Sequence, residues 1–386
     1  MRKKVFIICL LIISHLYAES AFKNIGNPYE RDYKNGEMIY ARNIWDMQLY
    51  QDKIYLGAGN SSNEGPAQNA GRLHVVVLDP MSDKFAFEYE VAEEQIDLFK
   101  TYGDTLYIPG HDATQNWILG NIYTKKDGMW KKIRTLPKAL HVYDLVVFDE
   151  KIFTAVGLNK NGAVFISNPH ADAWKQVPHA EGRVYSFLQI GEELFATKTF
   201  KTKYRNKLSM TQYKKNLNTF SARFDLDAFK MFPDTKLKSD SIKLGKSISY
   251  ENKALYLGVY KHNDHQNIPF GVYLASMQNN KLDVKKINLK DDYTPRDILH
   301  RDNFIYILVN QTEKNRENIK VLKFNKNDFS NYKEIIEFQY NSFARSFEEI
   351  NGCFYFGIGS EIKDPDAWNQ NELKKETGDI LKSCVQ

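Results

Sequence analysis

The side chains best suited to acid–base chemistry fall in three short segments. They are Glu93–Asp97, Pro109–Asp112 and His141–Asp144, which contribute Asp97, His111, Asp112, His141, Tyr143 and Asp144. A histidine beside several carboxylates can transfer protons or hold a divalent cation. Most clusters of this kind are loops held by their own hydrogen bonds, so the segments also fit a purely structural role.

Three arginines, Arg183, Arg296 and Arg345, are the second group of interest. A guanidinium group presents several N–H donors in a fixed plane, which matches the two oxygens of a carboxylate. The three arginines resemble the arginine group with which sialidases bind a substrate carboxylate, and that resemblance implies an acidic ligand if the fold brings them together.

An internal repeat indicates how the fold could do so. An apolar strand, a two-residue polar turn and a second strand centred on an aromatic residue recur seven times. The central aromatics are Tyr55, Tyr107, Phe153, Phe195, Tyr256, Tyr306 and Tyr355, at a mean spacing of 50 residues. Turn pairs such as Gln51-Asp52 favour tight hairpins, and the apolar strands are typical of strands buried on both faces.

Each period also has room for a second hairpin, for example Arg72–Leu78 with Phe85–Val91. Four strands per period of 40 to 60 residues are typical of a β-propeller blade. We therefore predict an all-β fold, a seven-bladed β-propeller of four-stranded antiparallel blades over residues 37–386. Residues 19–36 form an N-terminal closure segment, and a strand from residues 20–42 is expected to complete the last blade.

One turn carries a family resemblance. Ser167–Trp174 has the length and end residues of an Asp-box, although Pro169 and Ala171 replace its central Asp and Gly, and Thr124–Trp130 is a shorter relative. The chain thus resembles the broad kelch-like and sialidase-like group of propellers. That resemblance implies structural turns whose tryptophans pack between blades. Sialidase activity is disfavoured, because sialidases have six blades and an Arg-Ile-Pro motif that this chain lacks.

The repeat alignment places one set of polar side chains around the mouth of the central channel. The set comprises Asp46, Asp97, Tyr143, Asp144, Arg183, Tyr185, Arg296 and Arg345. Charged groups seldom lie near a buried axis without partners. They either pair with one another as structural contacts or face a ligand, and both interpretations stay open. With His111, Asp112 and His141 they make up the candidate ligand-binding residues; no catalytic residue is assigned.

The first eighteen residues resemble a secretory signal peptide. Arg2, Lys3 and Lys4 precede the apolar run Val5–Ile13, and Leu16–Ala18 is a suitable cleavage site. An uncleaved anchor is the alternative. Cleavage removes three positive charges and no negative ones, so the net charge falls from +5 to +2 and nucleic-acid binding loses its support. We predict an exported monomer, periplasmic or secreted, with no transmembrane segment after cleavage.

Two cysteines remain after cleavage, Cys353 and Cys384. An oxidising compartment favours a disulfide between them, and two unpaired small residues are the alternative. The chain has no Cys-x-x-Cys pair, no glycine-rich phosphate loop and no Gly-x-Ser-x-Gly elbow. We accordingly predict neither a metal site nor a cofactor.

These observations favour a binding or scaffold protein that takes a glycan or a protein on its long-loop face. The alternative is a carbohydrate-active enzyme, a glycoside hydrolase or lyase, with its polar site at the channel mouth. Propellers host both kinds of function, so the fold cannot decide between them.

Overall fold

The computed structural model describes residues 21–34, 36–62, 67–158, 161–179, 182–201, 209–223, 226–234, 241–263, 266–314, 316–363 and 373–385. The predicted signal peptide, residues 1–18, lies outside these ranges, so signal cleavage stays a prediction.

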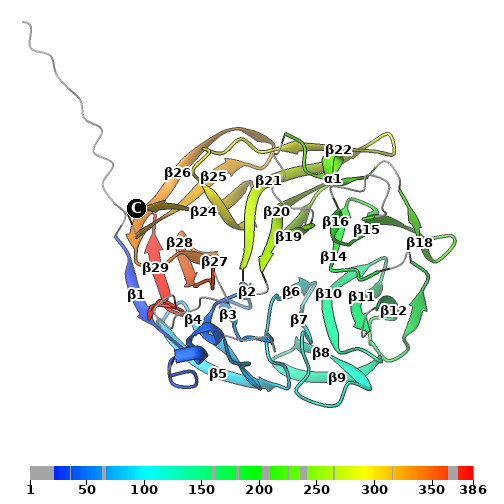
Figure 1. Cartoon of the computed structure of the whole chain (residues 1–386), viewed down its shortest axis with the longest axis horizontal. Helices are drawn as coiled ribbons and strands as arrows, with labels where there is room; N and C mark the ends of the chain where they lie inside the picture. Colours follow the sequence, from blue (N-terminus) through cyan, green and yellow to red (C-terminus); the bar gives the residue numbers. More distant parts are fainter. Residues whose placement is uncertain are drawn as a thin grey trace, which may run out of the picture.

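Seven antiparallel sheets are arranged radially around a central axis, as predicted (Figure 1). The first three blades are β2 (Asp46–Tyr50) to β5, β6 to β9, and β10 to β13, with β3 Lys53–Gly57, β4 Leu73–Asp79, β5 Lys84–Val91, β6 Lys100–Tyr102, β7 Thr105–Pro109, β8 Leu119–Lys126, β9 Met129–Pro137, β10 His141–Phe148, β11 Lys151–Leu158, β12 Asn161–Ser167 and β13 Lys175–Val177. The fourth and fifth blades contain β14 Ser186–Ile190, β15 Glu193–Thr197, β16 Phe200–Lys201, β17 Met210–Lys214, β18 Thr219–Ala222, β19 Ser241–Tyr250, β20 Lys253–Asn263, β21 Gln266–Gln278 and β22 Lys281–Lys286. The last two contain β23 Thr294–Arg301, β24 Phe304–Glu313, β25 Arg316–Asn325, β26 Asp328–Tyr340, β27 Ala344–Ile350, β28 Cys353–Ile358, β29 Ile380–Cys384 and β1 Lys23–Gly26.

The fifth blade departs from the four-strand pattern. The short strand β16 pairs with β19 and gives this sheet a fifth strand. Helical segments are limited to η1 (Gly36–Arg42) and α1 (Ala228–Met231) among the described residues. No helix in the described ranges is long and apolar enough to span a membrane.

Tight turns fix the register of the inner hairpins. Gln51 and Asp52 have φ values of 49° and 58°, and Asp149 and Glu150 have values of 53° and 55°. Two consecutive positive φ angles define the turn whose twist matches that of paired strands. The seven predicted hairpins are the inner strand pairs, β2–β3, β6–β7, β10–β11, β14–β15, β19–β20, β23–β24 and β27–β28.

The repeated aromatics are buried in the second strand of each blade and join neighbouring blades. The rings of Tyr55 and Phe99 are 6.2 Å apart between blades 1 and 2, and those of Phe153 and Phe187 are 6.5 Å apart between blades 3 and 4. Each period of the sequence therefore contributes to two interfaces, which explains why the same aromatic position recurs.

The Asp-box-like turns are structural, as the resemblance implied. The indole N–H of Trp174 donates to Thr135 Oγ1 of the preceding blade at 2.9 Å. Trp130 stacks on Tyr89 of blade 1 with ring centroids 5.4 Å apart. Both tryptophans thus fasten one blade to the previous one.

The ring closes in the seventh blade with a strand from each end of the chain. Strand β1 pairs with β29 as the outermost strand, which is the strand expected from residues 20–42. Cys353 and Cys384 are directly opposite each other on β28 and β29 and form a disulfide. Closure of this kind joins both ends of the chain in one sheet, so that neither end is left as an incomplete blade.

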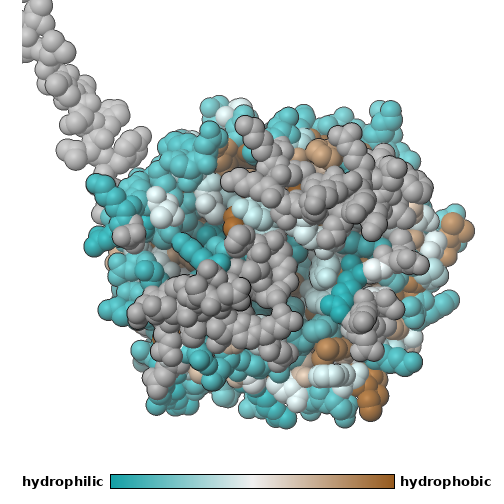
Figure 2. Space-filling model, in the orientation of Figure 1, coloured by the Kyte–Doolittle hydropathy of each residue, from teal (hydrophilic) through white to brown (hydrophobic). Residues whose placement is uncertain are grey.

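Hydrophilic side chains dominate the described part of the face in view in Figure 2, and hydrophobic ones appear there in a few separate places. Two large apolar side chains that are adjacent in the sequence, Trp117 and Ile118, are 61% and 69% exposed.

Candidate functional site

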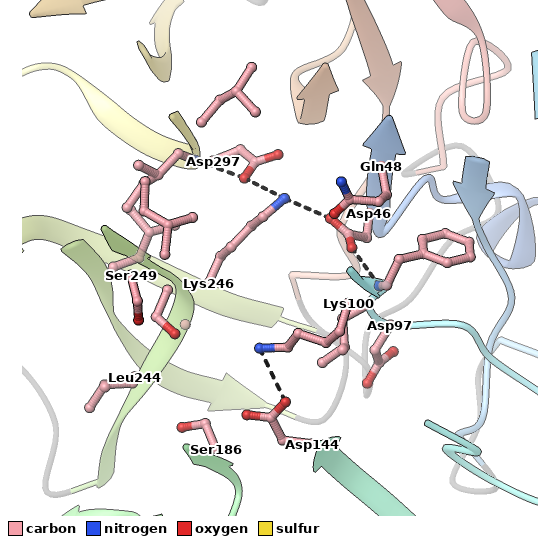
Figure 3. Close-up of a pocket in the computed structure, with 18 of the residues that line it drawn as sticks. Asp46, Gln48, Asp97, Lys100, Asp144, Ser186, Leu244, Lys246, Ser249 and Asp297 are labelled. Carbon is pink, nitrogen blue, oxygen red and sulfur yellow. Dashed lines mark hydrogen bonds and ion pairs between the residues drawn. The ribbon is translucent and has the colours of Figure 1, made fainter. Parts of the chain in front are cut away.

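A cavity of about 1030 Å³ follows the central axis and is lined mainly by the inner strands (Figure 3). We name two groups of its lining residues separately. The deep layer consists of Asp46, Lys100, Asp144, Lys246 and Asp297. The mouth consists of Trp45, Asp97, His111, Tyr143, Tyr185, Lys243, Arg296 and Arg345.

Charges in the deep layer neutralise one another. Lys246 Nζ is 2.7 Å from Asp46 Oδ1 and 3.0 Å from Asp297 Oδ1 (Figure 3). Lys100 Nζ is 3.3 Å from Asp144 Oδ1. Two lysines thus balance most of the charge on three buried carboxylates, as burial of charge requires.

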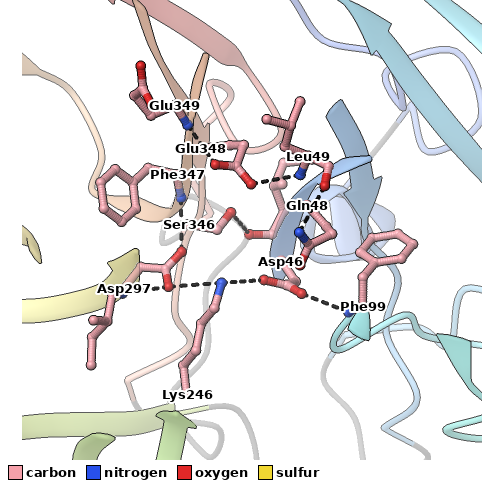
Figure 4. A network of polar contacts seen from close by, with 12 residues as sticks. Asp46, Gln48, Leu49, Phe99, Lys246, Asp297, Ser346, Phe347, Glu348 and Glu349 are labelled. Atoms are coloured by element: carbon pink, nitrogen blue, oxygen red, sulfur yellow. Dashed lines mark hydrogen bonds and ion pairs between the residues drawn. The ribbon is translucent and has the colours of Figure 1, made fainter. Parts of the chain in front are cut away.

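The same aspartates also join neighbouring blades. Asp46 Oδ2 accepts the backbone N–H of Phe99 at 2.7 Å, Asp144 Oδ2 that of Phe187 at 2.8 Å, and Asp297 Oδ2 that of Phe347 at 3.0 Å. Figure 4 shows two of these contacts around Lys246. We call each of them an inter-blade clasp. For Asp46 and Asp144 the contacts therefore favour the structural interpretation over a ligand-facing role.

Burial and the shared ion pairs perturb the ionisation of Asp297 and of Lys246. Burial raises the pKa of Asp297 to about 6, against the attraction of Lys246 and with a further contribution from Asp46. Burial opposes the charge on Lys246, but its two carboxylate partners raise its pKa well above the usual range. The lysine consequently stays protonated at any physiological pH.

At the mouth, His111 and Asp97 form an ion pair. His111 Nδ1 is 2.8 Å from Asp97 Oδ2, and the side-chain amide of Gln95 donates to the other oxygen of Asp97. Burial disfavours the charge on His111, but the Asp97 carboxylate outweighs it and raises the pKa of His111 to about 9. The pKa of Asp97 is lowered in spite of burial, because of His111. The pair is therefore an imidazolium–carboxylate pair at neutral pH.

Tyr143 connects this pair to a row of rings. It stacks on His141 with ring centroids 5.3 Å apart and lies 5.0 Å from the ring of Tyr185. Its hydroxyl accepts a hydrogen bond from Arg183 Nη1 at 2.9 Å. Burial raises the pKa of Tyr143, although Arg183 opposes the shift, so the group remains a neutral hydroxyl at physiological pH.

A buried glutamate holds the loop that carries His111. Glu93 accepts hydrogen bonds from Tyr123 Oη at 2.9 Å and from the side-chain amide of Asn121. The backbone of Glu93 pairs with that of Ala113 in an isolated antiparallel β-bridge, and Ala113 lies two positions after His111. Burial raises the pKa of Glu93 to about 7.

The two arginines on the other side of the mouth lie on aromatic rings. Arg345 Cζ is 4.2 Å from the ring centroid of Trp45, and Arg296 Cζ is 4.1 Å from that of Phe343. Glu361 Oε1 accepts from Arg296 Nη1 at 2.7 Å. Burial works against ionisation of Glu361, but Arg296 and Arg345 hold its pKa below the usual value.

The predicted site residues fall into two groups. Those that line the cavity are Asp46, Asp97, His111, Tyr143, Asp144, Tyr185, Arg296 and Arg345. Asp112, His141 and Arg183 lie behind this lining: His141 Nδ1 is 2.5 Å from Asp112 Oδ1, and Arg183 binds Tyr143. No group of three side chains suited to holding a metal ion occurs within the described ranges.

Several important residues escaped the sequence analysis. Asp297 occupies the same register as Asp46 and Asp144, opposite the second strand of its blade, so the repeat could have identified it. Lys246 lies where the pairing of β19 with β20 shifts register, which the repeat does not predict. Glu361 follows β28 in a loop, and its approach to Arg296 depends on the folded position of that loop.

No protein-family model matches this chain, and no curated protein matches its sequence. Comparison with solved structures gives propellers of very low sequence identity. The β-propeller domain of the Trilobed protease from Pyrococcus furiosus is 8% identical, with 82% of this chain and 90% of that chain covered and a TM-score of 0.48. An ancestral GH74 enzyme is 9% identical, with 83% of this chain and 44% of that chain covered and a TM-score of 0.49. A chain of the Mitotic Checkpoint Complex is 8% identical, with 93% and 96% covered and a TM-score of 0.49. At these sequence identities, no activity or ligand of those proteins can be assigned to this one.

Proposed function

We propose that this chain is an exported binding protein that takes a glycan at the mouth of its central channel. The observation that carries the proposal is the contrast between the contacts of these two groups of lining residues. Side chains of the deep layer are engaged with one another and with backbone N–H groups. The mouth instead combines aromatic rings with charged groups beside an open cavity of about 1030 Å³.

That combination fits a sugar. Aromatic rings such as Tyr143 and Tyr185 can pack against the apolar face of a pyranose, and the charged groups can bind its hydroxyls. Ligand sites are typically concave, largely apolar and fitted with a few well-placed polar groups. The half-buried ring of Tyr185 has no hydrogen bond from its hydroxyl to the described residues, so it is the best position at which to test this packing.

Catalysis on a glycan is the second candidate function, and the His111–Asp97 pair favours it. A carboxylate that orients and charges an imidazole is a common device for proton transfer. Tyr143 lies beside the pair, with its ring centroid 5.9 Å from that of His111. Asp144 is not available for this role, because Lys100 and the backbone N–H of Phe187 occupy its oxygens.

Export is part of the proposal and has independent support. The disulfide between Cys353 and Cys384 fits an oxidising compartment outside the cytoplasm. A mass measurement of the N-terminus of the exported protein tests it: a chain beginning near residue 19 supports cleavage, and one beginning at Met1 contradicts it.

Incubation of residues 19–386 with a broad glycan panel tests the function, with both retention and product mass recorded. Retention without a new product supports the binding protein. A product of changed mass supports the enzyme, provided that His111→Gln abolishes it. If neither occurs with any glycan, the proposed function is wrong, and the adjacent exposed side chains of Trp117 and Ile118 become the place to look for a protein partner.

A further inference from the structure

Two guanidinium groups from adjacent blades meet at one phenylalanine. Arg296 is in β23, Arg345 is in β27, and their Cζ atoms lie 4.1 Å and 5.0 Å from the ring centroid of Phe343. Trp45 covers Arg345 on another side, at 4.2 Å. Aromatic contacts therefore hold both cations in place at the wall of the cavity.

Hydrogen bonding leaves part of each guanidinium unused. Arg345 donates from Nε to Asn43 Oδ1 at 3.1 Å and from Nη2 to the backbone oxygen of Ser360 at 2.8 Å. Arg296 donates from Nη1 to Glu361, while its Nε is buried without a hydrogen-bond partner. Within the described part of the chain, Arg345 Nη1 and Arg296 Nη2 also have no hydrogen-bond acceptor.

The carboxylates at the mouth do not all reach the arginines. Asp97 and Asp112 lie beside His111, and Glu361 pairs with Arg296. Among the described residues, no carboxylate forms an ion pair with Arg345, whose hydrogen bonds go to Asn43 and Ser360. A guanidinium at the cavity wall without a carboxylate partner favours an anionic ligand.

Backbone packing supports the placement of Arg345. Gly359 lies against this side chain, and a Cβ atom there would be 2.7 Å from Arg345 Nε and 2.7 Å from Asn43 Oδ1. Glycine therefore permits the guanidinium to approach the loop after β28, and any larger residue would displace it.

We propose that the glycan ligand is acidic and that Arg296 and Arg345 bind the carboxylate of one of its sugars. This inference rests on the proposed function and narrows it from glycans in general to carboxylated ones, such as oligouronates. The planar carboxylate matches the unused N–H groups of the two guanidiniums, and Tyr143 and Tyr185 remain for the sugar ring.

The test compares each oligouronate with its carboxyl-reduced form, which keeps the same backbone and linkages and loses the charge. Galacturonate, glucuronate-containing and mannuronate oligosaccharides are titrated calorimetrically, together with sulfated forms of the reduced chains. We expect carboxyl reduction to weaken binding by about tenfold or more, as loss of a charge-assisted contact predicts. Sulfation of the reduced chain should not restore it.

Arginine variants complete the test. Arg345→Lys and Arg296→Lys keep the charge but lose the planar donors. Each should therefore weaken binding of the oligouronate by about tenfold and leave binding of the carboxyl-reduced form unchanged. Arg72→Lys, an exposed arginine paired with Glu90, is the matched control and should change nothing. Gly359→Ala should weaken oligouronate binding in the same way, because it displaces the guanidinium of Arg345 without replacing it.

The outcomes separate this inference from the proposed function. If reduced chains bind as tightly as oligouronates, or if only sulfated chains bind, the carboxylate site is wrong and the glycan-binding function stands. If no glycan of any kind is retained, the proposed function itself fails. Unfolding temperatures of all variants show whether a loss of binding reflects a loss of folding.

Discussion

The charge state of the mouth depends on one pair of residues, His111 and Asp97. A free imidazole would be largely neutral at physiological pH, but the Asp97 carboxylate, 2.8 Å away, keeps this one protonated against the effect of burial. His111 can serve as a proton donor only below the raised pKa of about 9 that the pair gives it.

Replacement of Asp97 should abolish this effect. In Asp97→Asn we expect the pKa of His111 to fall from about 9 toward its ordinary value of 6.5, because burial is then opposed only by the weaker attraction of Asp112 and Glu93. Titration of the His111 ring by NMR measures it, with His111→Gln to assign the signal. A pKa near 6.5 in the unchanged protein would contradict the ion pair.

The same pair makes stability depend on pH, with a definite sign. Because the pKa of His111 is raised in the folded state, its stabilising contribution is fully present below pH 6.5 and is lost as the pH rises through about 9. Denaturant unfolding of the wild type and of Asp97→Asn across this window should show the loss in the wild type only.

At the scale of the strand, the inter-blade clasps explain why carboxylates lie in the deep layer. Asp46, Asp144 and Asp297 each accept a backbone N–H of the following blade, next to a lysine that neutralises them. Each clasp joins two blades at their inner strands. These aspartates position the mouth residues that immediately precede them, Trp45, Tyr143 and Arg296.

Loss of a clasp should be costly. Asp144→Ala leaves the half-buried ammonium group of Lys100 without its partner and the N–H of Phe187 without an acceptor, so we expect the free energy of unfolding to fall by about 2–3 kcal/mol. Denaturant unfolding measures the change. Asp283→Ala, at a half-exposed position, is the control and should change stability by less than about 0.5 kcal/mol. Equal midpoints for the two variants would refute the structural role of Asp144.

The sequence was sufficient to predict the repeated hairpins, but it was not sufficient to predict the side-chain contacts between the blades. The hairpins are local, so the turn pairs and the seven aromatics predicted the blades and their number. Asp46 and Asp144 were recognised as channel residues, but their role depends on a backbone N–H some 43 to 53 residues away. Glu361 and Phe343 could not be assigned to the site, because loop positions over the mouth follow from tertiary packing rather than from periodicity.

At the scale of the whole molecule, the seventh blade determines whether the ring holds together. Its outer strand β1 comes from one end of the chain, and β29 comes from the other. Strand pairing between β1 and β29 covers only a few residues, so the disulfide between β28 and β29 is well placed to keep β29 in the blade.

Removal of the disulfide should therefore weaken the closure. Cys353 and Cys384 are 31 residues apart, and a cross-link of this length is worth about 3.7 kcal/mol in the chain-entropy description. We expect the double variant Cys353→Ser and Cys384→Ser to lose about that much stability. A reductant should lower the unfolding temperature of the wild type and leave that of the variant unchanged. Titration of two free thiols in the folded, unreduced protein would rule out the disulfide.

The most direct test of the account is whether the mouth of the channel is where a ligand binds. The measurement is the dissociation constant of a retained glycan for the wild type, for Tyr185→Ala at the mouth and for Phe87→Ala, a half-exposed aromatic in the outer strand of blade 1. We predict that Tyr185→Ala binds about tenfold or more weakly, since it loses a stacking surface, and that Phe87→Ala binds as the wild type does. Equal affinities for all three proteins would contradict a binding site at the mouth.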